Sequence, residues 1–405
     1  MKASRSDTLD ILLLIGSILA LGFSVVAAGG MAIIAGVNNI LQLLENAQAA
    51  WSIALIFTFM GLLTLPGLYL SYRSINGHPA RVSQSIPTSA FIVGVGLPFG
   101  IALGTLGQQL NVLAFILEPL GHVLAAISPM LFLSVLVIRQ LPLIPWRRVW
   151  GQFTGGLWLS PMIALILELA IAIPLVVLLF AYVLTEVDPR EFIQPLTSGA
   201  PLNQASMEAQ LQTLLRQPVL IISGLLFVSL IVPILEEMVK TFALWPMLRR
   251  GISPLYAFAG GAIAGGAYGL FEAFFLAQPG EGWAGLMVAR AGATSMHMIT
   301  TAMVSLGIAL AIQTRKWVKA LRYYLYAVLL HGTWNLAAIG VAAVYLVEEG
   351  SSSLEIGSSV TAVSIGSGII LSLLAAGAVF GLYRFPKNLL NQKLQSVEEA
   401  STGVS

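Results

Sequence analysis

Ten long apolar stretches make up most of this 405-residue sequence. Each one has the roughly 20 residues that a helix needs to cross the hydrocarbon core of a bilayer. Charged residues account for only 9% of the chain, which excludes a soluble, a disordered or a nucleic-acid-binding protein. We therefore predict an all-α, polytopic integral membrane helix bundle, with spans at about 9–36, 50–71, 88–107, 111–138, 155–185, 218–246, 254–276, 284–312, 321–347 and 359–383.

Lysine and arginine gather on one side of these predicted spans. If the N-terminus lies inside, the inside segments hold 16 basic residues and the outside segments hold only Arg190 and Arg216. Cytoplasmic loops carry such an excess, so we predict that the N-terminus and the C-terminus both lie inside. The longest loop, 186–217, then lies outside, and the polar tail after Arg384 is expected to fray.

Ten ionisable side chains fall inside the predicted spans, where each needs a partner or a function because a charge at the bilayer centre is costly. The N-terminal half contributes only Glu118, His122 and Glu168. We expect the first two to satisfy each other and Glu168 to bond within the bundle. The other seven predict a functional site in helices six to nine: Glu236, Glu237, Lys240, Glu272, Arg290, His297 and His331.

The sixth span places Glu236, Glu237 and Lys240 on one side of a helix, just after Pro233. Two adjacent carboxylates in a medium of low dielectric constant cannot both ionise easily unless a cation lies nearby. Lys240 could be that cation. The structural alternative is a buried ion pair that closes a contact between helices.

The next three spans each add polar groups. Glu272 lies among aromatic residues on a glycine-rich helix, and a bond to Arg290 is its structural alternative. His297 lies two helical turns from Arg290, and His331 lies one turn from Asn335. Carboxylates can deprotonate a water, imidazoles can bind a metal or orient that water, and amides can stabilise an oxyanion. The chain has no cysteine, so the chemistry predicted here uses an activated water.

These motifs resemble the PrsW family of polytopic intramembrane proteases. The matching pattern is E-E-x-x-K at 236–240, an aromatic four residues before Glu272, a mid-span His297, and H-x-x-W-N at 331–335. The aromatic is Tyr268, where the family pattern has Phe. The family is distantly similar to the type II CAAX prenyl proteases, and the first 215 residues match no element of it that we can name.

The resemblance implies an intramembrane peptidase of the metallo- or glutamic type in a bacterial plasma membrane. Its substrate would be a membrane-anchored protein such as an anti-sigma factor. Zinc could be held by His297, His331 and Glu237, although Glu, His and Asn could equally hold a water without metal. Lys240 and Arg290 would support the catalytic residues, which the resemblance gives as Glu236, Glu237, Glu272, His297, His331 and Asn335.

The resemblance also divides the chain into three parts. We expect N-terminal membrane helices and the outside loop in 1–217, a catalytic membrane core in 218–347, and a last span with a polar cytoplasmic tail in 348–405. An alternative function is a proton- or ion-coupled transporter that uses the same Glu/His cluster. Transporters usually show inverted repeats, and we find none in this sequence. A third alternative is a non-catalytic membrane scaffold.

Overall fold

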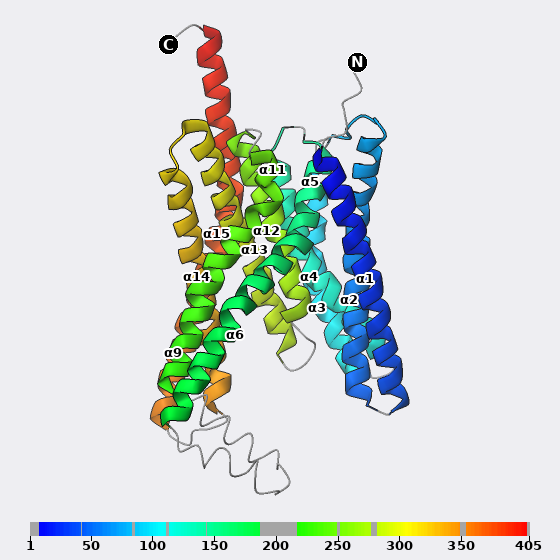
Figure 1. The fold of residues 1–405 in the computed structure, drawn as a ribbon, viewed down its shortest axis with the longest axis vertical. Coiled ribbons are helices and arrows are strands. Elements are labelled where there is room, and N and C mark those ends of the chain that lie inside the picture. Colours follow the sequence, from blue (N-terminus) through cyan, green and yellow to red (C-terminus); the bar gives the residue numbers. More distant parts are fainter. Residues whose placement is uncertain are drawn as a thin grey trace, which may run out of the picture.

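The computed structural model describes residues 8–41, 43–82, 86–110, 113–142, 144–186, 217–248, 252–276, 282–348 and 354–402, and within these ranges its regular elements are all helices (Figure 1). Ten helical stretches among the described residues are long and apolar enough to cross a membrane. Their positions follow the ten predicted spans, including the close pair on either side of residue 111. The all-α, polytopic membrane fold is therefore confirmed.

Several spans consist of more than one helical element, because π-helical or 3-10 turns interrupt them. The elements in chain order are α1 (Thr8–Ile40), α2 (Leu44–Ile75), η1 (Thr88–Val95), α3 (Gly96–Gln109), α4 (Ala114–Ile138), α5 (Trp146–Thr154), η2 (Gly155–Leu159), α6 (Ser160–Glu186), α9 (Pro218–Leu226), η3 (Phe227–Ile231), α10 (Val232–Val239), η4 (Lys240–Leu244), α11 (Trp245–Leu248), α12 (Pro254–Leu276), α13 (Trp283–Thr314), α14 (Val318–Glu348) and α15 (Leu354–Thr402).

The first residues of α1 and the last residues of α15 lie at the same end of the bundle (Figure 1). This arrangement agrees with ten crossings, while the assignment of that end to the inside stays a prediction. The expectation of a frayed tail is wrong, because α15 continues as one helix to Thr402. Its extension is rich in the helix formers Leu, Gln, Lys, Glu and Ala, and Leu389 packs on the core of the bundle. The loop 186–217 lies almost wholly outside the described residues.

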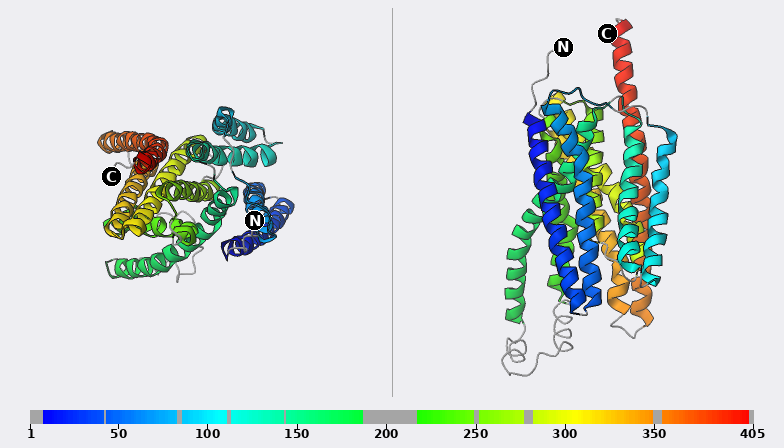
Figure 2. Two further views of the ribbon diagram at one scale, coloured as in Figure 1. Left: turned by 90° about the horizontal axis from the view of Figure 1, so that it is seen from above. Right: turned by 90° about the vertical axis from the view of Figure 1, so that its right-hand side faces the viewer.

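Helix α12 lies in the middle of the bundle (Figure 2) and is buried along most of its length. Its glycines allow α13 to come very close: a Cβ added at Gly265 would lie 2.2 Å from the carbonyl oxygen of His297. Lipid tails are as apolar as leucine, so membrane helices associate through such close packing rather than through the hydrophobic effect. The glycine-rich face of α12 therefore sets the position of His297.

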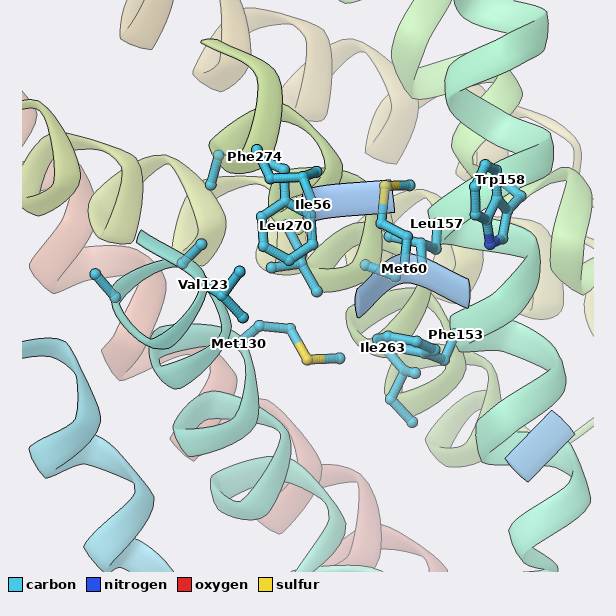
Figure 3. Close-up of a cluster of buried hydrophobic side chains, with 14 of the residues drawn as sticks. Ile56, Met60, Val123, Met130, Phe153, Leu157, Trp158, Ile263, Leu270 and Phe274 are labelled. Carbon is cyan, nitrogen blue, oxygen red and sulfur yellow. The ribbon is translucent and has the colours of Figure 1, made fainter. Parts of the chain in front are cut away.

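A large apolar cluster joins the N-terminal helices to α12 (Figure 3). Ile56 and Met60 of α2, together with Phe153 and Leu157 from the α5–η2 segment, pack toward Leu270 and its neighbours on α12. In contrast, the second half of α6 leans away from the bundle (Figure 2) and exposes side chains such as Val177 and Leu178. The predicted division into three parts stays a prediction.

Candidate active site

The polar residues of spans six to nine converge where α10 and η4 meet α12, α13 and α14. Pro233, at the start of α10, has no N–H to bond the carbonyl of Ser229 in the π-helical turn η3. At this position α14 approaches closely, since a Cβ added at Gly332 would lie 2.2 Å from the Ser229 oxygen. This contact places His331, the residue before Gly332, beside the acidic pair of α10.

Lys240 lies at the centre of the cluster and is fully buried. Its Nζ is 2.8 Å from Glu236 Oε2, 2.9 Å from Glu237 Oε1 and 2.8 Å from His297 Nδ1. The ammonium also lies 4.4 Å from the ring centroid of Tyr268, which adds a cation–π interaction. The predicted pairing of Lys240 with both carboxylates is therefore present in the structure.

Glu237 is fully buried, and one of its oxygens accepts several hydrogen bonds. Oε1 is 2.9 Å from Lys240 Nζ, 3.1 Å from the hydroxyl of Thr300 and 2.9 Å from His331 Nδ1. Because a carboxylate only accepts, His331 donates through Nδ1, and in the neutral imidazole the lone pair is then on Nε2. That Nε2 faces Glu236 Oε2 at 3.7 Å. The other oxygen of Glu237 has no hydrogen-bond partner among the described residues.

Glu272 joins α12 to α13. Its Oε2 accepts a hydrogen bond from Arg290 and lies 2.9 Å from His297 Nε2. The two sequence-based readings of Glu272 are therefore compatible, since the same carboxylate contacts Arg290 and a histidine of the cluster. His297 donates to Glu272 through Nε2 and accepts from Lys240 through Nδ1. The rings of His297 and His331 meet edge to face, with centroids 4.9 Å apart.

A possible metal site lies within this cluster. Glu236, His297 and His331 are all buried, and each offers a ligand atom within 4.8 Å of the others. Two imidazoles and one carboxylate are a ligand set that catalytic zinc sites use, so the residues fit a metal. The carboxylate ligand is therefore Glu236 and not Glu237, which the sequence analysis named. Oε1 of Glu237 already accepts bonds from three donors. Lys240 contacts two of the three candidate ligands, Glu236 and His297.

The structure keeps Asn335 apart from the hydrogen-bond network of the cluster. Its Nδ2 donates to the carbonyl of Val228 in η3 at 2.9 Å, one turn along α14 from His331. Within the described part of the chain, Asn335 makes no bond to the glutamates. Its predicted role as an oxyanion donor stays a prediction.

Comparison with known families supports what the geometry suggests. The family model described as "PrsW family intramembrane metalloprotease" matches residues 144–365, more than half of the chain. The chain belongs to the PrsW family. No curated protein and no solved structure gave a significant match. The protein is thus an integral membrane protein with an intramembrane protease domain, as the motifs predicted.

The PrsW match begins near α5 and includes a residue that the sequence analysis left outside the site. Glu168 lies on the face of α6 that carries Ser160 and Ala164, at intervals of four residues. Ser160 Oγ donates to the carbonyl of Val239 at 3.3 Å, and Ala164 packs against Val239 and Tyr268. This face of α6 therefore lies against α10 and the cluster.

Glu168 interacts electrostatically with Glu236, Glu272 and Lys240. Its Oε1 is buried and has no hydrogen-bond partner in the described ranges. We expected Glu168 to bond within the bundle; its Oε1 makes no such bond in the described ranges, and Glu168 interacts instead with the cluster. Only the spacing of Ser160, Ala164 and Glu168 could have indicated a polar helix face, and nothing in the sequence shows that this face meets α10. Thr300 was missed in the same way, because a threonine in a membrane helix is unremarkable.

The expectation that Glu118 and His122 satisfy each other is also wrong. Glu118 accepts a bond of 2.6 Å from the amide nitrogen of Gln48. His122 lies 3.3 Å from the carbonyl of Phe274 and accepts a bond of 3.2 Å from the indole N–H of Trp283. Two residues four apart on a helix can face different neighbours, and here α2, α12 and α13 supply the partners.

Proposed function

We propose that this protein hydrolyses a peptide bond of a membrane-anchored protein with a water activated by the Glu/His cluster. The observation that carries the proposal is the convergence of Glu236, His297 and His331 within 4.8 Å, beside a second carboxylate, Glu237. A bound divalent metal would supply Lewis-acid chemistry, which polarises a water and the substrate carbonyl. The ligand set favours zinc over a hard cation such as magnesium.

The charge balance of the cluster supports a metal. Four carboxylates, those of Glu168, Glu236, Glu237 and Glu272, interact with two cations, Lys240 and Arg290. Uncompensated charge is very costly in a site of low dielectric constant. A divalent cation held by Glu236, His297 and His331 would offset the excess of carboxylates over cations.

The residues of the chain then have distinct tasks. Glu237 holds His331 in the tautomer whose Nε2 is free, and Lys240 and Thr300 hold Oε1 of Glu237. Its unpartnered Oε2 is the atom that we assign to the general base, which removes a proton from the attacking water. Glu272 and Arg290 fix the ring of His297. Asn335 is proposed to donate to the oxyanion through its second N–H.

A metal-free, glutamic-type mechanism has one observation in its favour. The ammonium of Lys240 contacts Glu236, Glu237 and His297 at 2.8–2.9 Å and could itself serve as the central cation. Elemental analysis of the purified protein, paired with cleavage of a transmembrane substrate with and without chelator, decides between the two. We expect one bound metal per chain and loss of cleavage in chelator. Full cleavage by protein free of metal would contradict the metal-dependent proposal.

The family points to a substrate that spans a bacterial plasma membrane once, such as an anti-sigma factor. Reconstitution with labelled single-span proteins would test this directly. Cleavage is expected, and proteoliposomes should show no ion flux that depends on Glu237. Flux without cleavage would support the transporter alternative. Reporter fusions after Gly77 should read inside, whereas fusions near Gln204 should read outside.

A further inference from the structure

A cavity of about 980 Å³ lies between α1, the α5–η2–α6 segment and η4, and no residue of the Glu/His cluster lines it. Most of its wall is apolar. Leu12, Leu19 and Phe23 of α1 line it and are 57%, 68% and 52% exposed, so the cavity opens toward the surrounding lipid. An occupant from the membrane can therefore enter from the side.

One end of the cavity is polar and carries an excess of positive charge. Arg147 is already neutralised, because its Nη1 lies 2.9 Å from Asp10 Oδ2 and donates to Ser74 Oγ at 2.6 Å. Arg148 lines the same end and is exposed, and within the described ranges its guanidinium makes no hydrogen bond or ion pair. This end therefore presents one uncompensated guanidinium, a group that binds phosphate well.

Two buried hydroxyls in the wall have no hydrogen-bond partner in the described part of the chain. Thr154 is only 4% exposed, and its Oγ1 is unpartnered. Ser253 Oγ is likewise unpartnered, and Ser253 directly precedes Pro254, the first residue of the 23-residue helix α12. Neither oxygen has accessible surface, and that of Thr154 faces Gly67 of α2, so both hydroxyls are packed within the wall and do not face the cavity. The N-terminus of a long helix adds a preference for an anion.

The dimensions of the cavity suit a lipid. From Asp10 at the polar end to Phe23 at the other end is about 20 Å along α1, slightly more than the roughly 15 Å of one leaflet's hydrocarbon. The ring of Phe23 meets that of Trp158 across this far end, with centroids 5.9 Å apart.

We propose that this cavity binds one anionic phospholipid from the leaflet at the N-terminal end of α1. Its phosphate contacts Arg148 and lies near the N-terminus of α12, and an acyl chain extends toward Phe23. The lipid also packs on Phe242 and Ala243, which belong to the turn η4 that begins at Lys240. The site thus connects membrane composition to the segment that holds the central cation of the active site.

Native mass spectrometry of the full chain, titrated with phosphatidylglycerol or phosphatidylcholine of matched acyl chains, tests the headgroup. We expect phosphatidylglycerol to bind about tenfold more tightly, a preference worth about 1.4 kcal/mol. Arg148→Gln should remove this preference. Arg322→Gln is the matched control, because Arg322 is an exposed arginine of α14 that does not line the cavity, and it should keep the preference.

A second pair of variants tests the apolar part without changing charge. Gly16 lines the cavity and a Cβ there would meet nothing within 4 Å, so Gly16→Leu fills the space without a clash inside the protein. It should weaken binding of both lipids about tenfold. Gly22→Leu, equally unobstructed on α1 but outside the cavity, should change neither. Equal binding of the two lipids to the native chain would overturn the proposal. So would equal effects of the two arginine variants or of the two glycine variants.

Discussion

Glu118 and His122 on α4 bring the same side-chain types into the membrane as the cluster on α10, α12, α13 and α14, yet their surroundings differ. Each of the α4 pair is satisfied by neutral groups: Gln48 for Glu118, and Trp283 and the Phe274 carbonyl for His122. In the cluster, each carboxylate meets a lysine, an arginine or a histidine, and oxygens of Glu168 and Glu237 stay unpartnered among the described residues.

This difference separates structural polar groups from reactive ones. A neutral hydrogen bond between helices fixes their packing and leaves nothing to react. A cluster with more carboxylates than cations, and with unpartnered oxygens, is costly to bury. Such a cluster is expected where it binds a ligand or takes part in a reaction. If this interpretation is right, equivalent substitutions in the two places should affect different measurements.

The largest effect is expected for Glu237→Gln. The substitution keeps the size of the side chain but removes its charge and its capacity to take a proton. We expect cleavage to fall at least about a hundredfold, since general-base catalysis contributes 10²–10⁴-fold. The matched control is Glu118→Gln, which removes the same charge from α4 and should keep cleavage per folded molecule. Equal losses of cleavage in the two variants would mean that the α4 pair and the Glu/His cluster do not differ in function.

Removal of the metal comes next. Glu236→Gln, His297→Ala and His331→Ala should each lower the metal content of the purified protein, because each removes one of three candidate ligands. Substitution of a residue that hydrogen-bonds to a metal ligand typically lowers metal affinity 10–100-fold, and loss of a ligand itself should lower it at least as much. Thr300→Val should lower cleavage with metal retained, because Thr300 contacts Glu237 rather than a candidate ligand. Elemental analysis and a cleavage assay of the same preparations separate the two effects. Unchanged metal content in all three ligand variants would contradict the assigned ligands.

The sequence predicted the fold and most of the site because both depend on local patterns. Apolar length gives the spans, and spacing on one helix gives Glu236, Glu237 and Lys240 a shared side. Contacts between distant helices were not predictable in this way. The positions of Glu168 and Asn335 and the separate partners of Glu118 and His122 follow from which helix faces meet. Which faces meet depends on the glycines of α12 and α14 and on the turn at Pro233. The effect of these features on packing cannot be read from the sequence of one helix alone.

Glu168 should show an intermediate effect. It interacts electrostatically with the cluster, and its Oε1 makes no hydrogen bond among the described residues, so Glu168→Gln changes the field around Glu236 and Lys240 while the ligands stay in place. We expect a loss of cleavage of about tenfold, mainly in kcat, with metal content unchanged. Ser160→Ala, on the same face of α6 but two positions nearer to the N-terminus, removes a bond to the Val239 carbonyl and serves as a control for packing. If Glu168→Gln behaves as Ser160→Ala does, Glu168 is only a packing residue.

The smallest effect on cleavage is expected at His122, where the cost should appear in stability instead. Trp283→Phe removes the indole N–H that donates to His122 Nδ1 and keeps an aromatic ring in the buried site. The loss of one buried hydrogen bond should lower the free energy of unfolding by about 1 kcal/mol. Thermal denaturation in detergent would record this loss, and cleavage per folded molecule should stay at the native level. A loss of cleavage without a loss of stability would mean that Trp283 and His122 act in catalysis. The α4 pair would then not be a purely structural counterpart of the cluster.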